Sequence, residues 1–183
     1  MTIEQARIKY KPKKIKYLLI SETPPKSNSN RFFYFENVKE QDSLFLETMK
    51  VIYPESVLGI TTKEIRSIKK TFLEKFKNDG FYLIDSLNEP FEEKYSSPKK
   101  IKLIKEGQEN LLKRITKLLT SETIIVLISA TVFRANFEFL KENNINISNS
   151  ELIDFPGSGG QNKYREKLKK AITLYIANRA IKV

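Results

Sequence analysis

The sequence of 183 residues contains no cysteine and no histidine. The absence of cysteine excludes disulfides, thiolate nucleophiles and cysteine-ligated zinc or iron–sulfur centres. The absence of histidine excludes histidine general bases, histidine metal ligands and Ser-His-Asp triads. Any acid–base chemistry therefore falls to Asp, Glu, Lys or Tyr side chains.

Long hydrophobic runs are also missing. No apolar stretch approaches the roughly 20 residues that a membrane-spanning helix needs, and residues 1–17 lack the apolar centre of a secretory signal. We therefore expect a cytoplasmic protein without membrane contact. With 40% hydrophobic side chains, the chain has enough apolar surface for one domain with a substantial core. We expect residues 1–183 to form a single domain, in which residues 1–15 are a basic, irregular N-terminal arm.

Anionic side chains are outnumbered, and the formal net charge is +11. The cations concentrate in three blocks: residues 1–16 carry six against one anion, residues 94–117 eight against two, and residues 161–183 seven against one. Such clustering is typical of a surface that binds a polyanion, so we expect nucleic acid as the partner. A solvated basic surface is the alternative that the charges leave open.

Apolar runs and helical periodicity alternate along the chain. The short apolar runs predict strands at residues 16–21, 81–85, 123–129 and 151–154. Helical spacing and capping signals predict helices at residues 42–52, 62–78, 96–119 and 129–142, and one after residue 160 whose apolar positions from Tyr164 to Ile176 face inward. This order predicts an α/β protein, with three α/β/α layers around a four-stranded, mainly parallel sheet.

Polar or loop-forming residues follow all four predicted strands. They are Ser21-Glu22, Asp85-Ser86, Ser129-Ala130 and Asp154-Phe155-Pro156. Ligand sites of open α/β sheets lie at this end of the strands, so we interpret the four loops as one site. The aromatic cluster at residues 32–35 would add planar apolar surface, which suits a flat ligand such as a nucleobase. The alternative is a surface loop followed by core aromatics.

Two of these loops resemble motifs of the uracil-DNA glycosylase superfamily. The segment LLISETPP, residues 18–25, is similar to the Gly-Glu-Ala-Pro-Gly loop of the thermophilic branch, with Glu22 on the Glu and Pro24 on the Pro. The segment DFPGSGGQNKYREKL, residues 154–168, resembles the last motif, typically His-Pro-Ser, with Phe155-Pro156 on His-Pro and Ser158 near the Ser. The Glu-Thr-Pro-Pro sequence fits a divergent subgroup that carries a Glu-Ser/Thr-Pro-Pro loop.

The resemblance implies a uracil-DNA glycosylase-like fold and hydrolysis of the N-glycosidic bond of a damaged or unusual base in DNA. It implies the following roles: catalysis for Glu22 and Thr23; base binding for Pro24, Phe33, Tyr34 (with Phe32 as a further stacking candidate), Asp85 and Asn88; phosphate or DNA binding for Pro156, Gly157, Ser158, Gly159, Gly160, Asn162, Lys163 and Arg165. The chain departs from the family at Thr23, where many members have Asp, and at Phe155, where many have His. It also lacks the four-cysteine cluster of thermophilic members.

The residue at the end of the second predicted strand bears on which base is bound. The family has an Asn there, which offers one donor and one acceptor to uracil, whereas an ionised Asp85 offers acceptors only. We therefore expect a base edge with two donors, such as guanine or protonated cytosine. A turn residue that merely ends a strand is the alternative for Asp85.

The glycine run before the last helix is also open to two interpretations. Backbone N–H groups and the start of a helix favour an anion such as a DNA phosphate, and the following lysines strengthen this interpretation. A flexible turn is the alternative. We expect a monomer without cofactor or metal ion. Two other functions remain open: a non-catalytic nucleic-acid-binding module, and an enzyme acting on free nucleosides or nucleotides.

Overall fold

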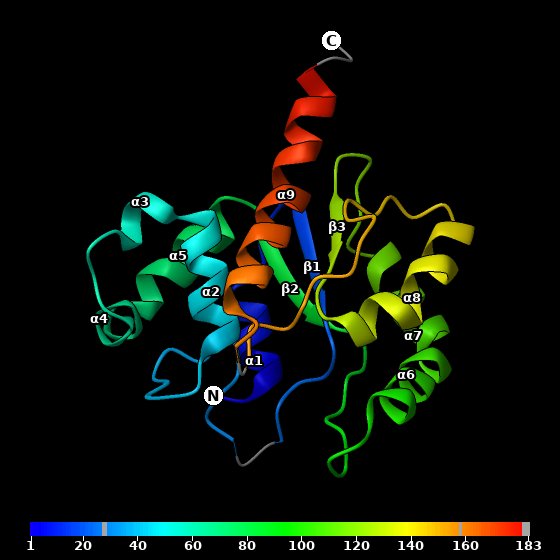
Figure 1. The fold of residues 1–183 in the computed structure, drawn as a ribbon, viewed down its shortest axis with the longest axis horizontal. Coiled ribbons are helices and arrows are strands. Elements are labelled where there is room, and N and C mark those ends of the chain that lie inside the picture. Colours follow the sequence, from blue (N-terminus) through cyan, green and yellow to red (C-terminus); the bar gives the residue numbers. More distant parts are fainter. Residues whose placement is uncertain (27–28, 158, 181–183) are drawn as a thin grey trace.

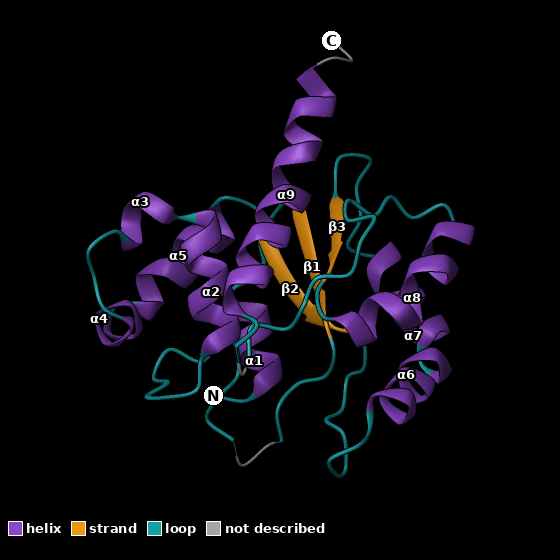
Figure 2. Cartoon of the chain, in the orientation of Figure 1, coloured by secondary structure: helices purple, strands orange, loops and turns teal. Residues whose placement is uncertain are grey.

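A three-stranded parallel sheet lies at the centre of the structure (Figure 2). The structure is a computed structural model that describes residues 1–26, 29–157 and 159–180, and the side chains of those residues up to Thr173. Strand β1 (Tyr17–Ser21) lies between β2 (Phe81–Asp85) and β3 (Ile124–Leu127). Nearly every strand residue is buried, because apolar helices cover both faces of the sheet.

Helices flank the sheet on two sides (Figure 1). On one side lie α2, α5 and α9, and on the other α6, α7 and α8, which gives an α/β arrangement in layers. The helix bounds are α1 (Ile3–Lys9), α2 (Ser43–Ile52), α3 (Pro54–Val57), α4 (Thr62–Ser67), α5 (Lys69–Asn78), α6 (Ser97–Glu106), α7 (Gln108–Thr116), α8 (Ala130–Glu142) and α9 (Gln161–Ala180). None of the helices in the described ranges is long and apolar enough to cross a bilayer.

The sequence signals that cap and end helices are confirmed at several positions. Thr61 accepts the N–H of Glu64 in a capping box that begins α4. Helix α5 ends at Asn78, and Gly80 follows with φ of 85°, a conformation that favours glycine. Ser129 caps α8 through the N–H of Val132. In α9, Tyr164, Leu168 and Ala171 face the core as expected, whereas the remaining expected positions beyond Thr173 lie outside the described side chains.

The predicted fourth strand is not formed as a strand in the described part of the chain. Residues 145–153 run beside β3 but make only two isolated parallel bridges, Ile125 with Ile147 and Ile128 with Ile153. Between these bridges the side chain of Asn149 takes the place of a backbone: its Oδ1 accepts the N–H of Leu127 at 2.9 Å and its Nδ2 donates to the Leu127 carbonyl at 3.2 Å. The sheet therefore has three strands, with a side chain closing the outer edge of β3.

Three helical expectations also need correction. Residues 1–15 are not wholly irregular, because Thr2 and Gln5 form a capping box that begins α1. The expected helix at residues 96–119 is divided at Gly107, where a Cβ atom would lie 2.5 Å from a side-chain carbon of Leu87. The expected helix at residues 62–78 is divided at Ile68, and the new helix starts with the buried Lys69.

Candidate functional site

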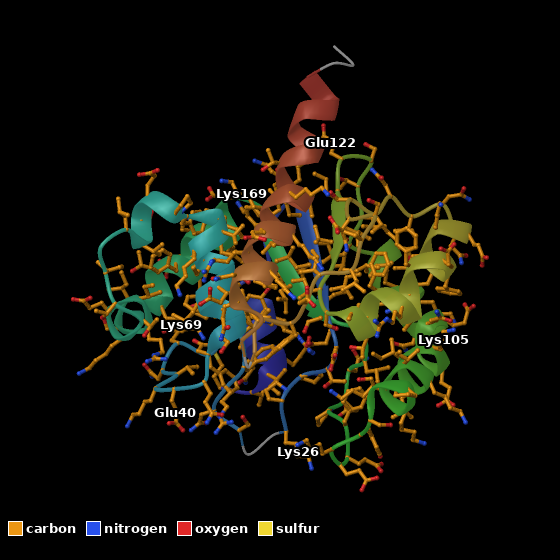
Figure 3. The ribbon with its side chains drawn as sticks, in the orientation of Figure 1. Lys26, Glu40, Lys69, Lys105, Glu122 and Lys169 are labelled. Carbon is orange, nitrogen blue, oxygen red and sulfur yellow. The ribbon has the colours of Figure 1, made fainter. Side chains whose placement is uncertain are left out.

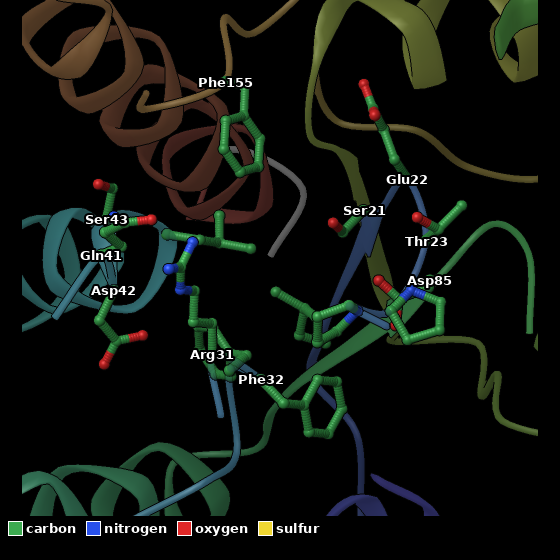
Figure 4. Close-up of a pocket in the computed structure, with 15 residues that line it drawn as sticks. Ser21, Glu22, Thr23, Arg31, Phe32, Gln41, Asp42, Ser43, Asp85 and Phe155 are labelled. Carbon is green, nitrogen blue, oxygen red and sulfur yellow. The ribbon is translucent and has the colours of Figure 1, made fainter. Parts of the chain in front are cut away.

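A cavity of about 300 Å³ opens where β1 and β2 end (Figure 4). Parallel pairing places Ser21, the last residue of β1, beside Asp85, the last residue of β2. This volume is at the lower end of the range for ligand pockets. The cavity is lined by Ser21, Glu22, Thr23, Pro24, Pro25, Arg31, Phe32, Phe33, Gln41, Asp42, Ser43, Leu44, Leu83, Asp85 and Phe155. Residues from two strand ends, the loop before α2 and the loop before α9 thus meet around one space.

Asp85 is the buried carboxylate of this cavity, with 3% of its surface exposed. Its Oδ2 accepts a hydrogen bond from Nη2 of Arg7 at 2.5 Å. Arg114 reaches the same place and donates to the main-chain carbonyl groups of Asp85 at 2.9 Å and Ser86 at 2.5 Å. Burial raises the pKa of Asp85, and the positive charge of Arg7 opposes that rise.

Arg7 belongs to α1, in the segment that the sequence predicts to be an irregular arm. Its guanidinium carbon lies 5.4 Å from the ring centre of Phe32, and its Nε is buried without a hydrogen-bond partner in the described part of the chain. The capping signal at Thr2 and Gln5 was present in the sequence and would have predicted the helix. The contact between Arg7 and Asp85 depends on how α1 packs against the end of β2. No local sequence pattern predicts that packing.

Glu22 lines the cavity, but its carboxylate points away from Asp85 and towards α8 (Figure 4). Its Oε1 accepts hydrogen bonds from the hydroxyl groups of Ser129, at 3.1 Å, and Thr131. Its Oε2 accepts from Nζ of Lys100 at 3.2 Å. Ser129 itself has φ of 84°, a costly conformation for a residue other than glycine. Glu22 therefore links the end of β1 to the start of α8.

Of the other residues expected to bind the base, Pro24 lines the cavity. Phe33, Tyr34 and Asn88 lie in three different environments. Phe33 lines the cavity but is almost fully buried, and its ring packs against Phe45 and Phe76. Tyr34 is wholly buried, and its hydroxyl is bonded to both main-chain groups of Leu83, so it belongs to the core. Asn88 is exposed and lines a neighbouring cavity together with Arg7 and Arg114.

Phe155 offers the aromatic surface that Tyr34 does not. It is 47% exposed, lines the cavity and projects from its loop towards the centre of the cavity (Figure 4). The loop turns sharply at Gly160, where a Cβ atom would lie 2.7 Å from the carbonyl oxygen of Phe155. The Gly160 N–H instead donates to the carbonyl of Gly157 at 2.8 Å. Only glycine fits this turn, and the turn sets the position of the ring.

None of the described residues that were expected to bind phosphate lines the cavity, although Phe155, at the start of their loop, does. Pro156 is buried, Gly159 is exposed, and neither lines the cavity; Ser158 lies outside the described residues. Arg165 is already engaged, since its guanidinium contacts the Glu47 carboxylate and the side-chain oxygen of Asn162. Lys163 is exposed and makes no hydrogen bond or ion pair within the described residues.

Asp42 lines the opposite wall of the cavity and forms a buried ion pair. It stands at the N-cap of α2, as its sequence position predicts, but its carboxylate accepts from Nζ of Lys69 at 2.6 Å instead of capping the helix. Burial is the main cause of both pKa shifts: it raises the pKa of Asp42 to about 6 and lowers that of Lys69 to about 8. The pair joins α2 to α5 beneath the cavity.

The cations of the basic blocks lie at both ends of the parallel strands. Arg7 and Lys100 lie beside the cavity, and so does Arg31, whose guanidinium is 3.8 Å from the Glu40 carboxylate. Lys16, by contrast, immediately precedes β1 and lies at the opposite end of the strands, where its N–H donates to the Gly80 carbonyl. Two of the three basic blocks thus place a cation beside the cavity, Arg7 from the first and Lys100 from the second, whereas Arg31 belongs to none of the blocks.

The described residues contain no cluster of three or more carboxylates suited to hold a metal ion. The cavity can instead offer hydrogen-bond donors from Ser21, Thr23 and Arg31, the acceptor oxygens of Asp85, and an aromatic face from Phe155. No protein-family model matches the chain, and no curated protein and no solved structure matches it either.

Proposed function

We propose that the cavity binds a nucleobase and that the protein hydrolyses the N-glycosidic bond of an altered base in DNA. The observation that carries this proposal is the convergence of Asp85 and Phe155, from segments 70 residues apart in the sequence, on one cavity of about 300 Å³. A planar ligand needs both a stacking face and a polar group for its edge, and these two residues supply them. The resemblance of residues 18–25 and 154–168 to uracil-DNA glycosylases points to the same chemistry.

The environment of Asp85 favours a particular kind of base. Arg7 and Ser21 both hydrogen-bond the Asp85 carboxylate, and both oppose the rise that burial causes in its pKa. The Asp85 side chain lines the cavity, where its oxygens would act as acceptors for a base. Acceptors complement the N1–H and exocyclic amine of guanine, or a protonated cytosine. Uracil presents a carbonyl acceptor on each side of its N–H, and these carbonyl oxygens would be repelled by the carboxylate oxygens of Asp85. The proposal therefore names a guanine-type or protonated base as the preferred ligand.

Glu22 would act on the sugar. Cleavage of the glycosidic bond gives the bonding electrons to the leaving base and leaves positive charge on the deoxyribose ring until water bonds to C1′. A carboxylate held in place stabilises that charge without reorganising. Three donors, from Ser129, Thr131 and Lys100, hold Glu22 at the end of β1. Thr23 follows in the cavity wall and offers a hydroxyl to the sugar or to a water molecule.

The direct test is the formation of abasic sites. Single-stranded and duplex oligonucleotides that carry altered guanine, cytosine or uracil bases are incubated with an excess of protein, and strand breakage after alkali is measured. We expect product with at least one guanine-type or cytosine-type base, and a loss of about 100-fold or more in Glu22→Gln, as for the loss of a main electrostatic contact. No product with any base would overturn the enzymatic proposal.

A second function is a binding module without catalysis. The observation that favours it is that Glu22 already has three hydrogen-bond donors, which leaves it less free to act on a substrate. In that case oligonucleotides would bind in equilibrium titrations and yield no abasic sites. The same two measurements thus separate the two functions.

A further inference from the structure

A second, larger cavity adjoins the first. It has a volume of about 830 Å³ and is lined by Lys26, Ser29, Asn30, Arg31, Asn37, Val38, Lys39 and Glu40. Arg31 lines both cavities, so the two spaces are neighbours that share this side chain. We call the second cavity the Lys26–Lys39 groove, after the two lysines that line it, and the first, which we propose binds a base, the base cavity. Any ligand that fills the base cavity and extends past Arg31 enters this groove.

The chemistry of the Lys26–Lys39 groove differs from that of the base cavity. Three cations and one anion line it, and that anion, Glu40, is 3.8 Å from Arg31. No aromatic side chain lines it in the described part of the chain, so it offers no stacking face. Its neutral lining groups include Ser29, Asn30 and Asn37, which donate hydrogen bonds. Cations together with neutral donors are the groups that proteins use on phosphate and sugar.

The two lysines are available for such contacts. Lys39 is exposed and makes no hydrogen bond or ion pair within residues 1–26, 29–157 and 159–180. Lys26 donates to the main-chain carbonyl of Glu92 at 2.5 Å, which fixes its amine at the rim and neutralises no charge. Lys26 and Glu40 lie near the end of the molecule where β1 ends, whereas Glu122 lies at the opposite end (Figure 3).

From this arrangement we infer that the Lys26–Lys39 groove binds the phosphodiester backbone next to the base that occupies the cavity. The inference rests on the proposed function and assigns the residues that would hold the backbone of its polynucleotide substrate. The base would enter the cavity beside Asp85, and the neighbouring phosphates would lie along Arg31, Lys26 and Lys39. Arg31, which both spaces share, would contact the first phosphate.

The test compares two variants that remove the same charge. Lys26→Gln/Lys39→Gln alters the groove, and Lys105→Gln/Lys113→Gln alters exposed lysines of α6 and α7 that line neither cavity. Each variant of the full chain is titrated with a fluorescent single-stranded 12-mer, with the matching duplex and with guanosine, at several salt concentrations. Thermal unfolding of both variants shows that they are folded.

We expect the groove variant to bind the 12-mer about 10-fold more weakly at 0.15 M salt, with a salt slope smaller by roughly 1.4, because each phosphate contact on single strands contributes about 0.7 to that slope. Guanosine binding should stay within twofold in both variants, and the control variant should bind the 12-mer nearly as the parent chain does. If the groove variant loses more affinity for the single-stranded 12-mer than for the duplex, the backbone bound in the groove is that of a single strand.

Several outcomes would overturn the inference. Equal losses in the two variants would mean diffuse attraction to a basic surface, and an unchanged groove variant would mean that the backbone lies elsewhere. In both cases guanosine binding would leave the proposed base cavity intact. Binding of a poly-glutamate peptide as tightly as the 12-mer, with the same loss in the groove variant, would show an acidic protein as the partner. If neither guanosine nor the 12-mer binds, the proposed function fails together with the inference.

Discussion

The hydroxyl group of Tyr34 bonds both main-chain groups of Leu83. It accepts the Leu83 N–H at 2.6 Å and donates to the Leu83 carbonyl at 3.1 Å. Leu83 belongs to β2, an outer strand of the sheet, so these two groups have no strand to pair with. Asn149 satisfies Leu127 at the other outer strand in the same way. At one position on each edge of the sheet, a side chain thus satisfies both outward-facing main-chain groups.

The first prediction concerns this hydroxyl group. Tyr34→Phe removes it and leaves two buried main-chain groups unsatisfied, so we expect the free energy of unfolding to fall by about 1–3 kcal/mol. Tyr53→Phe is the matched control, because the Tyr53 hydroxyl donates to Asp79 at 2.8 Å in a partly buried place. Its loss should cost less, about 0.5–1.5 kcal/mol. Urea unfolding measures both, and equal losses would contradict a special role for Tyr34.

The sequence predicted the strands better than the edges of the sheet. Residues 81–85 are buried throughout in β2, as a continuous apolar run indicates, and the pairing of Ser21 with Asp85 brings two predicted strand ends together. The aromatic cluster at residues 32–35 was misleading because its composition does not tell a core tyrosine from a ligand-binding one. The role of Tyr34 depends on Leu83, a residue 49 positions away, and only the folded chain brings them together.

Similar limits apply to the rest of the site. Arg7 lies in a stretch that the sequence predicted to be a basic, irregular arm, whereas it belongs to a helix and its guanidinium packs on Phe32 and pairs with Asp85. The predicted strand at residues 151–154 has the right apolar residue in Ile153, which bridges to Ile128. It forms no ladder because Asn149 bonds β3 through its side chain. Each difference arises from a contact between distant segments, which local periodicity does not encode.

The second prediction concerns the buried pair of Asp42 and Lys69. Lys69→Met leaves a buried carboxylate without its partner, and we expect a loss of about 3–5 kcal/mol in the free energy of unfolding at pH 7.5. The burial that already raises the pKa of Asp42 to about 6 then acts without an opposing cation, so the pKa rises further. Urea unfolding of Lys69→Met at pH 4.5 and pH 7.5 measures the effect.

The sign of the pH dependence follows from proton binding. The Asp42 carboxyl has a pKa of about 3.9 in the unfolded chain, so between pH 4 and pH 7 the folded variant binds more protons than the unfolded one. Stability of Lys69→Met should therefore fall as the pH rises through this range. The double variant Asp42→Leu/Lys69→Met removes both charges and should regain most of the loss at both pH values. A loss in Lys69→Met that is equal at the two pH values would rule out Asp42 as its cause.

The third prediction concerns the exposed ring of Phe155. Phe155→Ala removes the only half-exposed aromatic face among the described residues that line the base cavity, so affinity for guanosine should fall by about 1–3 kcal/mol. Phe155→Tyr keeps the face and should bind normally. Leu58→Ala, at an exposed apolar residue outside the cavity, is the control and should change nothing. Isothermal titration measures all three, and normal binding by Phe155→Ala would remove the ring from the site.

The fourth prediction concerns base preference. Asp85→Asn replaces a pure acceptor with one donor and one acceptor, which complements uracil. We expect the preference for guanine-type bases over uracil to decrease by about 10-fold or more, on the scale of 1–3 kcal/mol for one well-placed polar contact to a base. The substitution also removes the buried anion of the Arg7 guanidinium and leaves it only the exposed Glu4 carboxylate at 3.8 Å, so the folded protein should lose stability.

The two effects of Asp85→Asn can be separated. Arg7→Met/Asp85→Asn also removes the largely buried cation and should recover stability, while the amide still determines which base edge fits. Competition titrations with guanosine and uridine on both variants measure the preference, and urea unfolding measures the stability. If both variants keep the parent preference while folded, Asp85 does not contact the base edge, and its bond to Arg7 serves only to attach α1 to the end of β2.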